Sequence, residues 1–410
     1  MAFHLLTGQT LTPPKSKPVF FAATDGETGT SSNEQNGGPR LAIATGGTGG
    51  HFFPALSIAR EYRRRVGPAI LIIGGQQAQA HLELARQHGF STAHLDAVRM
   101  PPSFWGVPLF SLRLAWEVFR GRRLLRSLHI DRVLGMGSFA SVPLCLAAAF
   151  TGKPLFLHEG NAVLGRANRF LQRRARKLLL SLPLSNQQTP RAPTLLTGFP
   201  LRSELLTVSR NISSGNAAGE MRQKFGLDPN LPTLLVFGGS QGADFFNRLL
   251  PALCRSASPS TPLPPFQLLQ FTGSETAAEH LRRAFDQAGL PAYVAAWSNH
   301  MEEAYQAADL VLCRGGAATI AELAWFGKPA IIVPLPNAAE DHQSANAELL
   351  ARADAARFWR QDETTPARLK EAVAEFVAAP ERWQEQGRNF RSWSRPEAAR
   401  QIVDAIAGES

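Results

Sequence analysis

The chain has little cysteine and no long apolar run. Of its 410 residues three are cysteines (Cys145, Cys254 and Cys313), set in apolar or helical surroundings without C-x-x-C spacing. This usage predicts buried thiols in a reduced, cytosolic compartment rather than a disulfide framework. No apolar run approaches the roughly 18 residues that a membrane-spanning helix needs, and the N-terminus lacks a signal-peptide pattern. We therefore expect no spanning helix.

The chain also has fewer acidic than basic residues. The chain has 33 Asp and Glu against 43 Lys and Arg, a formal net charge of +10. No zinc-finger spacing, RNP-like aromatic motif or basic heptad pattern accompanies this charge, so we do not expect nucleic acid as a partner. An anionic lipid surface or a polyanionic substrate is the expected use of the charge. A basic surface with no specific partner is the alternative.

The length predicts more than one domain, because 410 residues exceed what a single core usually contains. Residues 24–38 read TDGETGTSSNEQNGG, a polar stretch rich in Gly and Ser, so residues 1–38 are expected to be a disordered leader. We expect one domain over residues 39–200 and a second over residues 201–385. A C-terminal helix over residues 386–410 is expected to pack back across both halves.

Short apolar runs alternate with helical segments in both halves, and glycine turns often follow them. The first expected strand begins at Leu41. The other expected strands cover residues 69–74, 131–134, 154–158, 234–237, 268–271, 293–296, 311–313 and 330–333. Residues 166–177 are expected to form an exposed basic helix, and residues 197–200 a linker. This alternation predicts an α/β fold with two Rossmann-like, doubly wound parallel sheets that face a cleft. The glycines that follow the first strand, at positions 46, 47, 49 and 50, do not have the spacing G-x-G-x-x-G. The evidence for a dinucleotide site is therefore weak.

Residues 311–347 contain the largest group of glycine and polar residues that suit a binding site. Gly315 and Gly316 join a short apolar strand to a predicted helix over residues 317–326, and such a junction directs free backbone N–H groups at a phosphate. Glu322 lies one turn beyond Thr319, so its carboxylate can accept from hydroxyl groups beside that phosphate. The next strand is followed by the polar residues 340–343. Together these features predict a nucleotide-sugar site.

Aromatic residues and arginines are interleaved over residues 99–126. In a helix, Leu112, Trp116 and Phe119 would share one face, while Phe110 and other apolar residues would form a second. Core packing is one explanation. The other is a cationic, aromatic surface that enters a lipid headgroup layer. On that interpretation we expect a membrane patch that contains four aromatic residues, Phe104, Trp105, Phe110 and Trp116.

Six ordered motifs, GGTGGHFFPALSIA, GMGSFASVP, HEGN, TGFPLR, GGSQGADFFN and CRGGAATIAE…DHQSANA, resemble the MurG family within glycosyltransferase family 28. The resemblance covers essentially residues 40–400. It implies a GT-B fold and an inverting transfer of GlcNAc, without metal or cofactor, from UDP-GlcNAc to the MurNAc 4-hydroxyl of lipid I (undecaprenyl-pyrophosphoryl-MurNAc-pentapeptide). The product would be lipid II for peptidoglycan synthesis, with consequences for cell shape and division. It also implies peripheral attachment to the cytoplasmic face of the cell inner membrane, where other cell-wall synthesis proteins are possible partners.

The resemblance also assigns roles. The diphosphate would be held by Ser240, Ala317, Ala318 and Thr319, the ribose by Glu322, the uracil beside Ser298, and the sugar by Gln343. Further donor positions would be Thr48, Gly49, Gly50, Asn161 and Arg202. The acceptor side would be lined by His51, Glu159 and Asn161.

Two residues are candidates for the catalytic base. His51 suits the role by its ordinary pKa, although it could instead only hydrogen-bond the glycine loop or a substrate phosphate. Glu159 is the rival, although it could instead form an ion pair with a neighbouring arginine. The chain departs from the family pattern at Gly160, Ser138, Phe199 and Ser344, where Gln, Gly, Asn and a second Gln are usual.

Two other functions remain open at this point. A UDP-GlcNAc 2-epimerase would share the fold and the donor, but it would need acidic residues near the sugar C2 and no membrane patch. A non-enzymatic nucleotide-sensing or nucleic-acid module would leave Glu322 and Gln343 dispensable.

Overall fold

The first half of the chain forms a seven-stranded parallel sheet. The computed structural model describes residues 37–46, 48–75, 78–98, 107–185, 189–209, 217–257, 260–336 and 341–408. The strand order is β3-β2-β1-β4-β5-β6-β7. The strands are β1 (Leu41–Gly46), β2 (Ala69–Gly74), β3 (Ser91–His94), β4 (Arg132–Gly135), β5 (Leu155–Glu159), β6 (Lys177–Leu180) and β7 (Thr194–Leu196).

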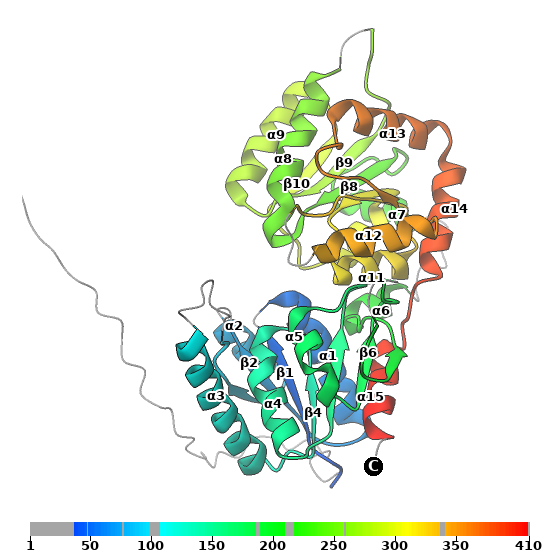
Figure 1. The fold of residues 1–410 in the computed structure, drawn as a ribbon. Helices are drawn as coiled ribbons and strands as arrows, with labels where there is room; N and C mark the ends of the chain where they lie inside the picture. The colour runs from blue at the N-terminus through cyan, green and yellow to red at the C-terminus, as the bar shows by residue number, and fades with distance from the viewer. Residues whose placement is uncertain are drawn as a thin grey trace, which may run out of the picture. The chain divides into compact units, whose positions relative to one another are not determined.

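Helices cover both faces of this sheet (Figure 1). They are α1 (Gly49–Arg65), α2 (Ala78–Gln87), α3 (Val107–Ser127), α4 (Val142–Phe150) and α5 (Arg166–Leu171), with 3₁₀ turns η2 (Phe139–Ser141) and η3 (Gln172–Arg174). In β1, Leu41 and Ile43 pack into the core under α1 and α2, whereas Ala42 and Ala44 pack into the core under α4. Burial on both faces explains why these strands read as continuous apolar runs.

The second half repeats this plan with six parallel strands in the order β10-β9-β8-β11-β12-β13. These are β8 (Thr233–Phe237), β9 (Gln267–Phe271), β10 (Ala292–Ala295), β11 (Leu310–Cys313), β12 (Ala330–Ile332) and β13 (Arg357–Phe358). Its helices are α6 (Ser203–Ser209), α7 (Ala217–Lys224), α8 (Gly239–Arg255), α9 (Glu275–Ala288), α10 (Met301–Ala307), α11 (Ala317–Phe326), α12 (His342–Arg352) and α13 (Pro366–Ala378).

Strand order fixes where a ligand can bind. Each sheet reverses its winding between two neighbouring strands, β1 and β4 in the first and β8 and β11 in the second. Open α/β sheets bind ligands outside the carboxyl ends of such strands. Glycine turns follow β1, β4, β8 and β11. The predicted fold of two doubly wound parallel sheets is therefore confirmed.

The chain ends in two further helices, α14 (Pro380–Arg391) and α15 (Ala398–Ala407). Trp383 and Phe390 of α14 are buried in the cores of the second half. By contrast α15 packs against α1, and its Ile402, Val403 and Ile406 belong to a core of the first half. Among the described residues, no helix combines the length and the hydropathy that crossing a bilayer requires.

The prediction for residues 166–177 was partly wrong. The helix ends at Leu171, its Ala167 and Asn168 are buried, and Lys177 begins strand β6. The run that follows Lys177 is apolar and buried, so it is used as a strand although basic residues precede it. The predicted linker over residues 197–200 is also well packed, because Thr197 and Phe199 are buried. The predicted leader lies almost entirely outside the described residues, and the predicted domain boundaries stay predictions.

Candidate functional site

Residues from both halves line one cavity at the carboxyl ends of the strands. Seven of the predicted site residues meet there: Thr48, Gly50, His51, Glu159 and Asn161 of the first half, and Ala317 and Ala318 of the second. His342, the first residue of α12, lines the same cavity. The cavity therefore combines a helix N-terminus, imidazoles and an amide.

The start of α11 supplies free backbone donors to this cavity. Gly316 caps the helix in an extended conformation, with φ −71° and ψ 142°. The first N–H that bonds back within this turn is that of Ile320, which donates to the Gly316 carbonyl over 3.0 Å. The N–H groups of Ala317, Ala318 and Thr319 thus have no carbonyl partner within the helix. Together with the helix dipole they favour an anionic group.

Gly315 brings a second element to this turn. A Cβ atom at Gly315 would lie 2.6 Å from the backbone oxygen of Gln343, so no side chain fits there. The side-chain oxygen of Gln343 accepts a hydrogen bond from the Leu335 N–H over 2.9 Å. That bond orients the amide, and its nitrogen, which donates no hydrogen bond among the described residues, could donate to a ligand.

Glu322 lies one turn further along α11. Its Oε2 accepts a hydrogen bond of 2.7 Å from the Tyr305 hydroxyl, and its Oε1 is 3.9 Å from Nη2 of Arg202. Burial raises the pKa of Glu322, while Tyr305 and Arg202 act in the opposite direction. The structure therefore brings together the predicted residues Glu322 and Arg202. It adds Tyr305, for which the sequence carried no signal.

His51 sits at the first turn of α1, where its Nδ1 is 2.8 Å from the Thr48 hydroxyl. Burial lowers the pKa of His51, and the nearby His342 lowers it further. The imidazole is therefore neutral near pH 7 and can accept a proton. The contact with Thr48 also matches the alternative in which His51 hydrogen-bonds the glycine loop.

The Glu159 carboxylate is almost fully buried and is held by amide donors. Oε1 accepts from the backbone and side-chain nitrogens of Asn161 over 3.1 and 3.2 Å. Oε2 accepts from the Gly165 N–H over 3.0 Å and from the Asn168 side chain over 2.9 Å. Four such bonds stabilise the loop that follows β5 and occupy the acceptor positions of the carboxylate.

His158 precedes Glu159 in β5, and burial lowers the pKa of its imidazole to about 3. The Nε2 of His158 lies 3.0 Å from the Ser181 hydroxyl. A histidine that stays neutral at any ordinary pH is suited to holding β5 and β6 together.

Asn346 of α12 joins the two halves. Its side-chain oxygen accepts from the Ala162 N–H over 2.8 Å, and its nitrogen donates to the Asn161 side chain over 3.1 Å and to the Gly315 carbonyl over 3.0 Å. The side chain is fully buried. The sequence pattern indicated no role for Asn346, because its partners lie 185 and 31 positions away in the chain.

Arg314 is a second residue for which the sequence pattern indicated no role. Its guanidinium donates to the carbonyls of Gly242, Val333 and Pro334 and to the side chain of Gln361, over 2.8–3.2 Å. Burial lowers the pKa of Arg314 to about 10. One side chain thus links the segments that follow β8, β11, β12 and β13.

Four other residues are predicted to bind the sugar donor. Two of them are next to residues that line the cavity, and two follow other strands. Gly49 opens α1, and Thr319 is in the first turn of α11. Ser298 precedes α10, and its hydroxyl accepts from the His300 N–H over 2.9 Å. Ser240 is in the first turn of α8, and its side chain lies outside the described part of the structure.

The predicted membrane patch is only partly described. Phe104 and Trp105 lie outside the described residues. In α3 Phe110 is half-buried, whereas Trp116 is 62% exposed. The large apolar residues that α3 exposes are Val107, Leu109, Leu112, Trp116 and Phe119.

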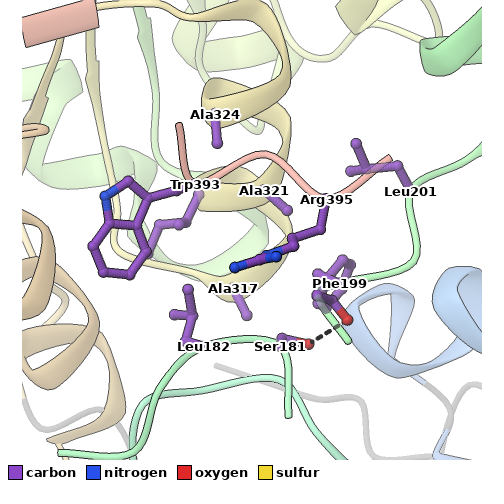
Figure 2. A pocket seen from close by; sticks show the side chains of 11 residues that line it. Ser181, Leu182, Phe199, Leu201, Ala317, Ala321, Ala324, Trp393 and Arg395 are labelled. Carbon is purple, nitrogen blue, oxygen red and sulfur yellow. Dashed lines mark hydrogen bonds between the residues drawn. The ribbon is translucent and has the colours of Figure 1, made fainter. Parts of the chain in front are cut away.

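A smaller pocket lies beside α11 (Figure 2). Ala317, Ala321 and Ala324 reach it from α11, and Trp393 and Arg395 reach it from the segment after α14. Ala317 and Phe199 line both this pocket and the main cavity, so they separate the two.

Two of the departures from the family pattern meet at this wall. A Cβ atom at Gly160 would lie 3.6 Å from the Phe199 ring and 3.4 Å from the Ala317 Cβ. A Cβ atom at Gly160 would therefore be in ordinary van der Waals contact with both neighbours. A third departure, Ser138, lines the cavity, and a Cβ atom at Gly46 would lie 2.8 Å from its hydroxyl.

Known proteins resemble the chain along most of its length. The glycosyltransferase family 28 N-terminal domain matches residues 41–180, and the glycosyltransferase family 28 C-terminal domain matches residues 233–402. The UDP-N-acetylglucosamine--N-acetylmuramyl-(pentapeptide) pyrophosphoryl-undecaprenol N-acetylglucosamine transferase of Magnetococcus marinus is 36% identical over 375 residues, which are 90% of this chain and 96% of that protein. The protein of the same name from Geotalea uraniireducens is 34% identical over 374 residues, 90% of this chain and 98% of that protein.

Solved structures show the same relationship. The crystal structure of Acinetobacter baumannii MurG has a TM-score of 0.71 at 26% identity and covers 90% of this chain and 99% of its own. A UDP-GlcNAc 2-epimerase from Neisseria meningitidis, bound to UDP-GlcNAc, has a TM-score of 0.63 at 13% identity over 90% of this chain and 100% of its own. That second likeness is one of fold alone.

Proposed function

The chain belongs to glycosyltransferase family 28, and from that premise we propose that it moves GlcNAc from UDP-GlcNAc to the MurNAc 4-hydroxyl of lipid I, giving lipid II. One observation carries the proposal. The free N-terminus of α11 and the neutral imidazole of His51 line a single cavity, so a diphosphate leaving group and a proton acceptor can act on one sugar.

The donor diphosphate would lie over the first turn of α11. The N–H groups of Ala317, Ala318 and Thr319 would stabilise the negative charge that develops on UDP as it leaves. Glu322 would accept from the ribose hydroxyls, and the amide nitrogen of Gln343 would donate to the sugar. Because these groups are held before the donor arrives, they need little reorganisation during the reaction.

Transfer then needs a nucleophile. The acceptor 4-hydroxyl would attack C1 of GlcNAc from the face opposite UDP, and the bond between C1 and the diphosphate oxygen would break with inversion. His51 would take the hydroxyl proton at Nε2, provided that its Nδ1 carries a proton and donates it to Thr48. We favour His51 over Glu159 because four amide donors occupy the Glu159 carboxylate.

The acceptor lipid also places the enzyme at a membrane. We propose that α3 docks on the cytoplasmic face of the inner membrane through the exposed stripe formed by Leu109, Leu112, Trp116 and Phe119. The rings of Trp116 and Phe119 are stacked, with centroids 5.9 Å apart. Arginines of the same helix would add attraction to anionic lipids. In this proposal Phe110 belongs to the packed side of α3.

The test of the function is an assay with labelled UDP-GlcNAc, with and without a soluble lipid I analogue. Transfer requires the acceptor, whereas epimerisation proceeds without it and a binding module consumes no donor. We expect label in a disaccharide product only when the acceptor is present. Conversion of the donor in its absence would overturn the proposal in favour of an epimerase.

A further inference from the structure

Tyr305 is buried at the centre of the donor half. Its ring stacks on Phe326 of α11, with centroids 5.2 Å apart, and meets the edge of Phe237 at the end of β8 at 6.0 Å. Phe237 leads into the glycine turn after β8, and Phe326 closes the helix that begins at the phosphate turn. Tyr305 therefore packs between the two elements that would hold the donor.

The hydroxyl of Tyr305 has one polar contact in the described structure, the hydrogen bond of 2.7 Å to Oε2 of Glu322. The other oxygen, Oε1, has a looser partner in Arg202, at 3.9 Å. A carboxylate has about four acceptor positions on its two oxygens. One strong bond to Oε2 thus restrains the orientation of the group and leaves Oε1 able to accept from a ligand.

We propose that Tyr305 is a positioning residue that orients the Glu322 carboxylate toward the ribose of the donor and so makes donor binding depend on the ribose hydroxyls. The inference rests on the proposed function, because it assigns the ribose to Glu322. It adds the residue that sets the geometry of that contact.

The alternative orientation shows why the bond matters. Without the hydroxyl, Arg202 is the partner of the carboxylate that remains among the described residues, so the group would turn toward the segment that joins the two halves. The pKa of Glu322 is already raised by burial and by the Glu302 carboxylate of α10, and Tyr305 opposes that rise together with Arg202. The imidazole of His300 is 3.1 Å from Glu302 and can neutralise it only when protonated. Loss of the Tyr305 bond would therefore favour protonated Glu322, a poorer acceptor.

The experiment compares UDP-GlcNAc with its 2′-deoxy and 3′-deoxy ribose analogues in the transfer assay. We expect wild-type enzyme to discriminate against at least one analogue in kcat/KM by about tenfold or more, the value of a hydrogen bond to a charged group. Tyr305→Phe should raise KM for UDP-GlcNAc by a similar factor, change kcat little, and remove most of that discrimination. Tyr293→Phe is the matched control, because its hydroxyl makes no hydrogen bond among the described residues and the ring packs on Phe225.

A second variant keeps the inference testable if Tyr305→Phe proves unstable. In Glu322→Gln the discrimination should be lost with Tyr305 intact, and adding Tyr305→Phe should then have little further effect on it. Full discrimination and an unchanged KM in Tyr305→Phe would overturn the inference while leaving the proposed function in place. If Glu322→Gln itself keeps wild-type discrimination, the ribose lies elsewhere and the inference fails with that part of the donor assignment. Absence of acceptor-dependent transfer by wild-type enzyme would remove both.

Discussion

The side-chain nitrogen of Asn346 lies 3.1 Å from the side-chain oxygen of Asn161, and the contact joins α12 of the second half to the loop after β5 in the first. The same nitrogen reaches the Gly315 carbonyl, and its oxygen holds the Ala162 N–H. A single buried amide thus connects the loop after β5 with the glycine turn that precedes α11.

Asn346→Ala should both destabilise the protein and weaken catalysis. The change leaves the Ala162 N–H and the Gly315 carbonyl without their buried partner, at a cost of about 1–3 kcal/mol. Thermal unfolding should show a lower Tm, and KM for the donor should rise. Asn389→Ala is the control, since that side chain is only partly buried and its one hydrogen bond among the described residues is to the Asp354 carbonyl. Equal effects from the two variants would contradict a special role for Asn346.

His51→Gln tests the catalytic base. If His51 takes the acceptor proton, kcat should fall by about 10²–10⁴ with little change in donor affinity. Because the pKa of His51 is lowered, its neutral form persists below pH 6.5, and the acid limb of kcat/KM should lie below that value and disappear in the variant. The exposed His94 offers a control in His94→Gln. A pH profile that keeps its acid limb in His51→Gln would assign the limb to another group.

Glu159→Gln separates a base from a scaffold. An amide in place of the carboxylate presents an N–H₂ group to donors such as the Gly165 N–H or the Asn168 side chain, so a hydrogen bond is replaced by repulsion. We expect a loss of stability of about 1–3 kcal/mol, measured by urea unfolding. A variant of wild-type stability that had lost only kcat would instead make Glu159 the base.

Arg314→Met should disorganise the donor half. Its removal leaves the carbonyls of Gly242, Val333 and Pro334 without their donor, and we expect a stability loss of at least about 2 kcal/mol. UDP affinity, measured by calorimetry, should fall as well. Arg382→Met, at an exposed position of α14, should change neither quantity. Unaltered UDP affinity in Arg314→Met would mean that the four segments keep their places without it.

Paired substitutions on α3 test the membrane proposal. Leu112→Ser combined with Trp116→Ser should leave unfolding and UDP binding unchanged but reduce sedimentation with anionic vesicles, because both residues are exposed. Phe110→Ser should act mainly on stability. Trp297→Ser controls for loss of an exposed tryptophan elsewhere. Vesicle binding equal to that of wild type in the double variant would exclude this stripe as the docking surface.

The sequence allowed the strands at the glycine turns to be predicted well, because an apolar run that ends in glycine has few other uses in an α/β chain. The prediction failed at β6, because the four basic residues from Arg173 to Lys177 indicated an exposed helix where a buried strand begins. The resemblance supplied the seven residues that meet in the cavity. It did not supply the roles of Tyr305, Arg314 and Asn346, because buried polar partners depend on contacts between distant segments and leave no periodic pattern.

The position of α15 has a consequence during protein synthesis. The core of the first half needs Ile402, Val403 and Ile406, yet the last strand of its sheet ends at Leu196. About 200 further residues must therefore be translated before that core is complete, which takes on the order of 10–40 s at roughly 5–20 residues per second. For that interval the surface of α1 that α15 will cover has no partner from α15.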